Sequence, residues 1–317
     1  MNYSNQDLLN FVKKIKFTRE DKAKYQNQID NLIFSLSRHI KEKTDTKVLK
    51  VIQSGSWKKG TILKPKDGNP VDIDLVFFLD IEFNNYSTFQ EINSLIVSFL
   101  KDIYPNKQSS DFWENPKTAG IEFRISGLNV DIVPVREVEV QDYVEQPDKD
   151  LNMYFTSPKG QLEFIKKRKE ENTNFTSIVR MLKRWKNIKN LRLSSFSIEL
   201  IAAYLDINKG VESDIQEALI RFFDFLSRKE IPLIHFNAPY GKIPINNDNC
   251  LVVIDPTYNE NNTTKYLTQT DWKDIQDDAK FAFENIVYAN ELDYKNETLS
   301  LWKNIFGKEF SIDLLYS

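Results

Sequence analysis

The spacing of apolar residues divides the chain into a first half of mixed strands and helices and a mainly helical second half. A capping-box pattern begins at Thr18, and apolar residues then recur at steps of three and four up to about Lys43, which predicts a long helix. Short runs rich in β-branched and aromatic residues predict strands between turn-forming segments. The strands expected are 47–52, 71–80, 120–126 and 128–135, and a further helix is expected over 88–103.

Beyond residue 161 the apolar pattern becomes helical. One stripe with helical spacing runs from Phe175 to Trp185, and further helices are expected over 196–205 and 215–226. The polar segment 141–150 is typical of a junction between two lobes. A length of 317 residues also suits two domains. We therefore expect an α/β (α+β) domain over residues 1–150, which includes the long N-terminal helix, and a helical lobe over residues 151–317.

Composition excludes several classes of protein. Hydrophobic residues make up 41% of the chain and aromatic residues 13%, which rules out a disordered or collagen-like protein. With one cysteine, Cys250, and two histidines, His39 and His235, a disulfide framework and a Cys- or His-rich metal cluster are both excluded. A catalytic metal must then be bound by carboxylates. Apolar runs are too short for a bilayer span and the N-terminus lacks a signal-peptide pattern, so we expect a cytoplasmic protein that does not bind a membrane.

Positive charge is concentrated in one stretch of the chain. The formal net charge is −3 at pH 7, but residues 159–192 hold eleven Lys and Arg against three Glu. A local basic stretch suits a compact anion better than a long nucleic acid, which needs a broad basic face. We therefore expect a function that does not require duplex DNA or RNA.

Three aspartates carry the clearest chemical signal. In the strand expected over 71–80, Asp72 and Asp74 are two residues apart and point to the same face, while their apolar neighbours point to the core. Asp131 lies near the start of another expected strand, and we expect it to join them. Three carboxylates this close raise one another's pKa values unless a divalent cation neutralises them, and ligation by oxygen alone points to Mg²⁺.

A second signal precedes the strand of Asp72 and Asp74. The strand expected over 47–52 runs into Gln53-Ser54-Gly55-Ser56, a small-residue turn that can open a short helix. Backbone N–H groups at such a turn favour phosphate oxygens, and the Ser56 hydroxyl adds a donor. The turn is therefore expected to bind phosphate while the aspartates bind metal.

These motifs resemble those of the polymerase-β-like nucleotidyltransferase superfamily. The match consists of a Gly-Ser turn in SGSWKKGT (54–61), an Asp-x-Asp strand in VDIDLVFFL (71–79) and a third acid in NVDIVP (129–134). Fifteen residues separate Ser56 from Asp72, a little more than is common in the superfamily, which suggests an inserted loop over residues 64–69.

Within that superfamily, the sequence is most similar to the cGAS/DncV-like branch. Its bacterial members are the CD-NTases of CBASS anti-phage signalling, which are related to oligoadenylate synthetase. Three segments of the second half resemble elements of that branch's helical lobe, in the same order. They are MLKRWK (181–186), SSFSIEL (194–200) and VIDPT (253–257).

The resemblance implies roles for residues that spacing alone leaves open. A lysine at the position of Lys183 would grip the triphosphate, a polar residue at Ser195 would contact it, and an aromatic at Phe196 would stack on the base. Spacing alone is equally compatible with Lys183 on a solvated helix face, Ser195 as a helix N-cap and Phe196 in the core. The nucleotide-binding residues expected are Gln53, Gly55, Ser56, Lys183, Ser195 and Phe196.

The resemblance also implies a fold and a reaction. The fold would be a polymerase-β-like palm with a mixed sheet, joined to a helical C-terminal lobe, with nucleotides bound between them. Two Mg²⁺ ions, replaceable by Mn²⁺, would be held by Asp72, Asp74 and Asp131, while a ribose hydroxyl attacks the α-phosphorus of a nucleoside triphosphate and pyrophosphate leaves. Repeated steps would close a cyclic di- or trinucleotide second messenger that activates a downstream effector. The enzyme is expected to act as a monomer.

Two other functions share parts of this pattern. A linear oligoadenylate-forming or RNA-tailing nucleotidyltransferase would have the same palm and leave its product open. A nucleotide-binding pseudoenzyme that serves as a scaffold would have lost one or more of the acids, yet Asp72, Asp74 and Asp131 are all present.

Overall fold

Residues Phe17–Leu162 form a unit built around a sheet, and Met1–Lys16 together with Glu163–Ser317 form a second, mainly helical unit. We call them the sheet unit and the helical unit. The computed structural model describes residues 3–65, 69–81, 88–140, 142–147, 153–230, 232–244 and 250–311. The division differs from the expected one at 1–150 and 151–317, because the N-terminal segment belongs to the helical unit.

The sheet unit contains a mixed sheet whose two central strands are parallel. The order is β1-β2-β5-β4-β3, β6 pairs with β5, and β7 pairs with β6. Only the β2–β5 pair is parallel among the described pairings of this sheet. The mixed sheet expected from the sequence is therefore confirmed. The strands are β1 (Lys47–Gln53), β2 (Val71–Asp80), β3 (Phe112–Glu114), β4 (Ala119–Phe123), β5 (Leu128–Glu137), β6 (Val144–Pro147) and β7 (Met153–Thr156).

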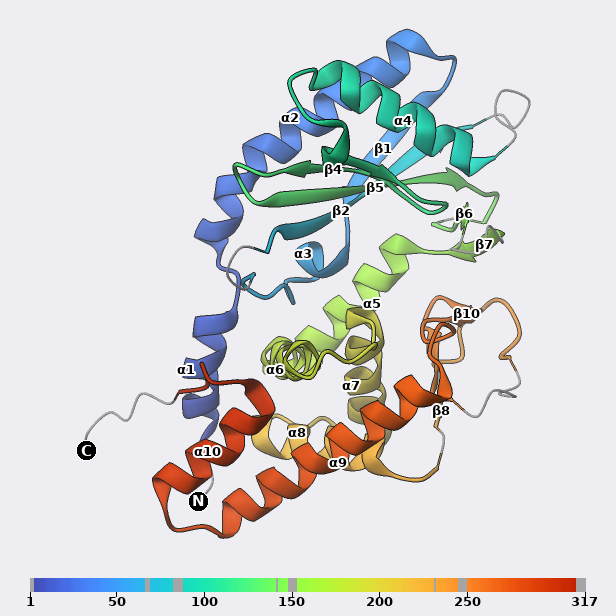
Figure 1. Ribbon diagram of the computed structural model, residues 1–317. Helices are drawn as coiled ribbons and strands as arrows, with labels where there is room; N and C mark the ends of the chain where they lie inside the picture. The colour runs from blue at the N-terminus through green and yellow to red at the C-terminus, as the bar shows by residue number, and fades with distance from the viewer. Residues whose placement is uncertain are drawn as a thin grey trace. The chain divides into compact units, whose positions relative to one another are not determined.

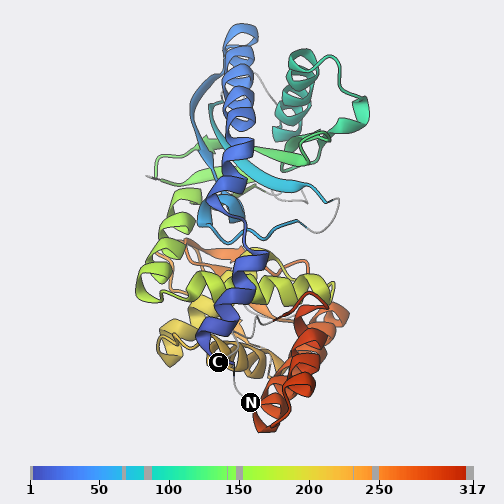
Figure 2. The ribbon, with the colours of Figure 1, turned by 90° about the vertical axis from the view of Figure 1, so that its left-hand side faces the viewer.

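Two helices, α2 (Arg19–Lys43) and α4 (Phe89–Ile103), cover one face of this sheet. They lie next to each other in Figure 1 and in the view turned by 90° in Figure 2. Strand alternation supplies the core beneath them, because Ile73 and Leu75 of β2 and Val130 of β5 all point to this face. The intervening residues, which include the predicted aspartates, therefore point to the opposite face. A short helix, α3 (Gly55–Lys59), follows β1.

The helical unit is held together by aromatic side chains. Trp185 packs edge to face against Phe223, and Trp302 stacks on Phe306 and Phe310. No helix among the described residues is both long and apolar enough to cross a membrane. The helices are α1 (Asn5–Ile15), α5 (Pro158–Glu171, which begins in the sheet unit), α6 (Phe175–Ile188), α7 (Ser195–Lys209), α8 (Ile215–Ser227), α9 (Gln269–Glu291) and α10 (Lys295–Phe306), and a small sheet contains β8 (Leu233–Ile234), β9 (Val252–Asp255) and β10 (Tyr258–Asn262).

Helix α1 explains why the N-terminal segment belongs to the helical unit. Its buried residues include Phe11, whose ring lies 4.6 Å from that of Phe310 and 6.3 Å from that of Phe306. This helix was not expected from the sequence, although Ser4 and Asp7 form a capping box at its start.

The segment expected as a lobe junction, 141–150, is partly a strand of the sheet. Val144–Pro147 form β6, which pairs with both β5 and β7, so this part of the segment belongs to the sheet unit. Residues 141 and 148–150 lie outside the described residues, as do residues 66–68 of the loop expected over 64–69.

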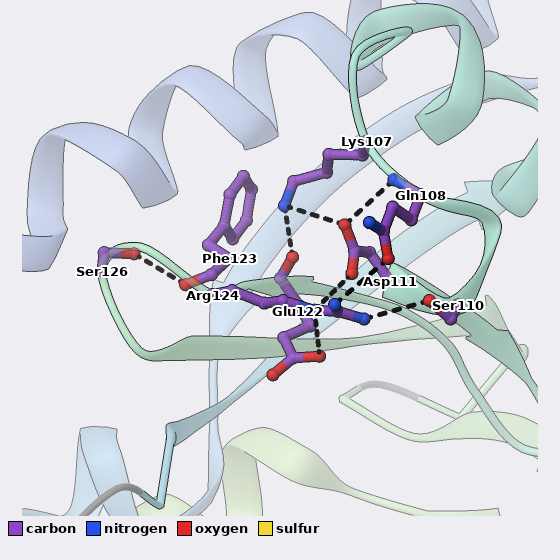
Figure 3. A network of polar contacts seen from close by, with 8 residues as sticks. All are labelled: Lys107, Gln108, Ser110, Asp111, Glu122, Phe123, Arg124 and Ser126. Carbon is purple, nitrogen blue, oxygen red and sulfur yellow. Dashed lines mark hydrogen bonds and ion pairs between the residues drawn. The ribbon is translucent and has the colours of Figure 1, made fainter.

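A network of polar contacts fastens the segment before β3 to the turn that follows β4 (Figure 3). Asp111 is 5% exposed and lies at its centre, with its Oδ1 2.7 Å from Nε of Arg124. The same carboxylate accepts a hydrogen bond from the backbone N–H of Gln108 at 3.1 Å, and Arg124 also donates to the hydroxyl of Ser110 at 3.0 Å. A buried carboxylate is thus neutralised at this edge of the sheet, which fixes the approach to β3.

We expect Arg124→Gln to lower the free energy of unfolding of the sheet unit by about 1–3 kcal/mol, because it leaves the buried Asp111 carboxylate without its closest cation. Urea unfolding of the full chain measures the loss. Lys43→Gln is the matched control, since its ion pair with Asp102 is solvent-exposed on both sides and its removal should change stability little. Equal effects of the two substitutions would contradict the prediction.

Candidate active site

The three predicted aspartates lie on one face of the sheet, on its two central strands. Asp74 of β2 stands directly opposite Asp131 of β5, and Asp72 stands opposite Asn129. Opposite residues on neighbouring strands point to the same face, and so do residues two apart on one strand. The structure therefore brings the three carboxylates to the face that α2 and α4 leave uncovered.

The surroundings of these carboxylates disfavour their charged forms. Burial is the main cause that raises the pKa of Asp72, of Asp74 and of Asp131. The charge of Asp131 raises the pKa values of Asp72 and Asp74 further, while Lys117 and Lys59 act in the opposite direction on the pKa of Asp74. The ionised forms of these carboxylates are therefore disfavoured by desolvation and, for Asp72 and Asp74, by repulsion from Asp131, a cost that a bound cation relieves.

The donor chemistry of these residues fits a hard divalent cation such as Mg²⁺. All three offer carboxylate oxygens, the ligands that Mg²⁺ prefers. In the part of the chain that the structure describes, no three Asp, Glu, His or Cys side chains form a ready-made group of metal ligands. The carboxylates of Asp72, Asp74 and Asp131 would thus have to converge further on an ion.

The Gly-Ser turn predicted to bind phosphate is locked onto β2. The backbone N–H of Ser54 donates to the carbonyl of Asp74 at 2.8 Å. Gly55 has a φ of +60°, and a Cβ placed on it would lie 1.8 Å from Oδ2 of Asp74. Only glycine therefore allows the turn to approach the carboxylate this closely. Ser56 is half-buried in the first turn of α3.

Gln53, the other residue predicted in this segment, has an internal partner. It stands opposite Leu75 in the β1–β2 pair, and its Oε1 accepts a hydrogen bond from the indole N–H of Trp57 at 3.2 Å. The side chain thus braces α3 against β1. Its predicted contact with nucleotide stays a prediction.

The structure also places residues near the acids that sequence reasoning missed. Lys59 is 7% exposed, and its charge lowers the pKa of Asp74. Lys117, in the turn between β3 and β4, lowers the pKa values of both Asp74 and Asp131. Trp113 of β3 donates its indole N–H to Oδ1 of Asp131 at 3.0 Å. Lys59 belongs to the SGSWKKGT motif, which was a signal that could have found it. Trp113 and Lys117 reach the acids only through the order of strands in the sheet.

The remaining predicted residues, Lys183, Ser195 and Phe196, lie in the helical unit. Lys183 is 3% exposed, and its Nζ lies 2.6 Å from Oε1 of Glu199 on α7. The solvated-face interpretation of Lys183 is therefore wrong, because the side chain is buried in an ion pair. Whether Lys183 also grips phosphate stays a prediction.

The start of α7 also differs from the alternatives left open by spacing. Ser194 is the N-cap, and its hydroxyl accepts a hydrogen bond from the N–H of Ser197 at 2.9 Å. Ser195 is the first residue of the helix and is exposed, while Phe196 is half-buried. The N-cap role of Ser195 and the core position of Phe196 are thus both wrong. The predicted residues form two sets, one in each unit.

We expect Gly55→Ala to weaken Mn²⁺ binding at the acids at least tenfold, because the added methyl group collides with the Asp74 carboxylate. Gly127→Ala is the matched control. Gly127 has a similar φ of +66°, so both substitutions strain the backbone, but a Cβ on Gly127 meets nothing within 4 Å. Electron paramagnetic resonance of Mn²⁺ measures the affinity. Equal losses in both variants would attribute the effect to backbone strain and contradict the prediction.

We expect Asp74→Asn to stabilise the metal-free protein by about 0.5–2 kcal/mol at pH 7.5, because it removes a carboxylate whose charged form is disfavoured by burial and by the charge of Asp131. The pKa of Asp74 is raised by folding. Protonated Asp74 therefore adds to the stability of the fold. This gain is fully present below the pKa of Asp74 in the unfolded chain and is lost as the pH rises through its pKa in the folded protein. The advantage of the variant should shrink as pH falls toward 4.

Urea unfolding at a series of pH values measures this difference. Asp80→Asn, at the exposed end of the same strand, is the control and should change stability little. A gain for Asp74→Asn that does not depend on pH, or a loss at pH 7.5, would show that the site is not electrostatically strained.

Comparison with known proteins places the chain in a family. The model of the Second Messenger Oligonucleotide or Dinucleotide Synthetase domain (SMODS) matches residues 1–172. An Escherichia coli (strain KTE188) protein named CBASS oligonucleotide cyclase CdnC is 32% identical over 94% of both chains. The Cyclic AMP-AMP-AMP synthase of Escherichia coli (strain MS 115-1) is 30% identical over 94% of both chains.

Solved structures show the same fold. The structure of E. coli MS115-1 CdnC in complex with HORMA-deltaN has a TM-score of 0.82 at 28% identity, and covers 97% of this chain and 98% of its own. The structure of the same protein with ATP has a TM-score of 0.81 at 28% identity, and covers 98% and 99%. The predicted fold, a nucleotidyltransferase palm with a helical lobe, is thereby confirmed. The chain belongs to the family of second messenger oligonucleotide or dinucleotide synthetases, and is a nucleotidyltransferase of the cGAS/DncV-like branch that includes the CBASS cyclases.

Proposed function

We propose that this enzyme joins nucleoside triphosphates into a cyclic di- or trinucleotide, with Mg²⁺ bound by Asp72, Asp74 and Asp131, and releases pyrophosphate at each step. The observation that carries the proposal is the pairing of Asp74 with Asp131 on adjacent parallel strands, which gathers three carboxylates on the face of the sheet opposite α2 and α4. The relatives named as an oligonucleotide cyclase and a cyclic AMP-AMP-AMP synthase, each aligned over 94% of the chain, support a cyclic product.

Each part of the sheet-unit site has a task in this reaction. Divalent cations bound there supply charge stabilisation for the attacking and leaving oxygens. Asp72, Asp74 and Asp131 provide the ligands, and their repulsion in the metal-free state favours binding of the cation. The turn at Gly55 and Ser56 contacts phosphate next to Asp74, to which Ser54 is hydrogen-bonded. Attack by a ribose hydroxyl on the α-phosphorus then needs no protein nucleophile.

In the helical unit, the proposed nucleotide-binding residues lie at one place. Ser195 and Phe196 open α7, and Glu199 follows one helical turn after Ser195. The ion pair with Glu199 fixes the Lys183 ammonium beside this turn of α7. We assign Ser195 and Lys183 to contacts with the triphosphate and Phe196 to stacking on the base. To bind phosphate, Lys183 exchanges its ion pair with Glu199 for one with the triphosphate.

The proposed enzyme does not need duplex nucleic acid. Of the eleven basic residues in 159–192, eight already form ion pairs within the chain, so the stretch does not provide a broad basic face. They are Lys159, Lys166, Lys167, Arg168, Lys183, Arg184, Lys189 and Arg192. The structure of a relative, E. coli MS115-1 CdnC, was solved in complex with HORMA-deltaN. We propose that a protein partner of this kind regulates the present enzyme.

The purified full chain should convert NTPs to a cyclic product with Mg²⁺ or Mn²⁺. The assay incubates nuclease-treated protein with all four NTPs, treats the mixture with phosphatase and identifies the resistant product by mass spectrometry. Asp131→Asn should retain less than about a tenth of the activity, because a metal ligand contributes more than ~1.4 kcal/mol to the barrier. Asp80→Asn should retain full activity, and added duplex DNA or RNA should change little.

Three results would contradict the proposal. A product fully destroyed by phosphatase would favour a linear oligoadenylate-forming or RNA-tailing enzyme. Higher residual activity of Asp131→Asn would remove Asp131 from the metal site. Strong stimulation by duplex nucleic acid that falls with salt would show that an extended basic surface is used.

A further inference from the structure

Four residues form a straight row across the sheet that ends at the paired acids. Trp113 of β3 stands opposite Gly120 of β4, Gly120 stands opposite Asp131 of β5, and Asp131 stands opposite Asp74 of β2. Strands β4, β5 and β2 lie side by side in Figure 1. Because directly opposite residues share a face, the indole of Trp113 and both carboxylates lie on the same side of the sheet.

Gly120 provides the space that lets the Trp113 ring cross β4. A Cβ on Gly120 would lie 2.1 Å from Cε2 of Trp113 and 2.4 Å from its Nε1, so the ring rests directly on the glycine backbone. Glycine in the interior of a strand weakens the strand, and it commonly marks a place where another group approaches the backbone closely. The approaching group here is a side chain that reaches over one strand to the next.

The ring delivers a hydrogen bond to a single oxygen of Asp131. The indole N–H donates to Oδ1 at 3.0 Å, and the hydroxyl of Thr118 lies 3.5 Å from the same oxygen. The turn that carries Thr118 is itself anchored, because Asn93 of α4 donates its side-chain amide to the carbonyl of Asn115 at 2.9 Å. A carboxylate held through one oxygen keeps the second oxygen for another ligand.

We propose that Trp113, seated on Gly120, is a positioning residue that orients the Asp131 carboxylate for binding of a divalent cation. The inference rests on the metal-dependent function proposed above and adds two residues to it that the nucleotidyltransferase motifs do not contain. An indole N–H is a donor only, so it holds the carboxylate without competing for the cation. Partners of this kind fix the orientation of metal ligands, and their loss weakens metal binding.

A purely structural role for Trp113 predicts a different outcome from a positioning role. Trp113→Phe keeps an aromatic ring beside Gly120 and removes the N–H together with part of the indole ring system. We expect it to weaken Mn²⁺ binding about tenfold, measured by electron paramagnetic resonance with Mn²⁺ as the only ligand, with little change in melting temperature. In the proposed reaction, kcat should fall while KM for the NTP stays within about twofold, because the change affects metal orientation and not nucleotide binding.

Trp302→Phe is the matched control. It makes the same exchange of indole for phenyl, at a buried residue whose N–H has no hydrogen-bond partner among the described residues. Its Mn²⁺ affinity should equal that of the wild type. Affinity of Trp113→Phe within twofold of the wild type, or an equal loss in Trp302→Phe, would overturn the proposal.

A second substitution tests the role of the glycine. Gly120→Ala should displace the ring and reproduce the loss of Mn²⁺ affinity, yet in a Trp113→Ala background it should add nothing, because there is no ring to displace. A further loss in that background would overturn the proposed route through the ring.

The indole N–H of Trp113 also reports directly on the metal. In an NMR spectrum, the five tryptophans give five indole N–H signals, and the signal that is lost in Trp113→Phe belongs to Trp113. On addition of Mg²⁺ it should shift more than the signals of Trp185, Trp272 and Trp302, and Asp131→Asn should abolish the shift. A Trp113 indole N–H signal that does not shift on addition of Mg²⁺ would overturn the proposal. A wild-type chain that binds Mn²⁺ but forms no cyclic product would refute the proposed function, while the comparison of Mn²⁺ affinities still decides the role of Trp113.

Discussion

The parallel register between β2 and β5 is the constraint on which the site depends. It sets Asp74 opposite Asp131 and, at the next position, Leu75 opposite Ile132. A slip of one residue would turn the acids into the core and the apolar side chains outward. Burial of Leu75 and Ile132 beneath α2 and α4 opposes such a slip, so apolar packing on one face holds like charges together on the other.

The sheet unit treats its buried acids in two opposite ways. At the edge, Asp111 is neutralised by Arg124 and bonded by the backbone, and it supports the fold. At the centre, burial raises the pKa values of Asp74 and Asp131, and the charge of Asp131 raises the pKa of Asp74 further. Favourable interactions at the edge and in the core therefore offset the unfavourable electrostatics at the centre. Those unfavourable electrostatics are relieved when a cation binds there.

Much of the sheet unit could be predicted from the sequence because its central strands carry two signals at once. Strand β2 was predicted at its observed bounds, since alternation marks one face as core and the aspartates mark the other. Trp113 was missed because it lies 18 residues from Asp131 on a three-residue strand without periodicity. Buried partners such as Glu199 for Lys183 were missed because an ion pair between two helices leaves no mark in spacing.

The separation of α1 from the rest of its unit has a consequence for the order in which the protein is made. The sheet unit is an uninterrupted segment, so it is complete when Leu162 has been synthesised. Domains generally fold as units during synthesis, from the N-terminal side onward. The apolar face of α1 packs against Phe306 and Phe310, near the other end of the sequence. On the ribosome, the sheet unit with its three aspartates is therefore expected to form first, while the apolar face of α1 stays exposed until α10 emerges.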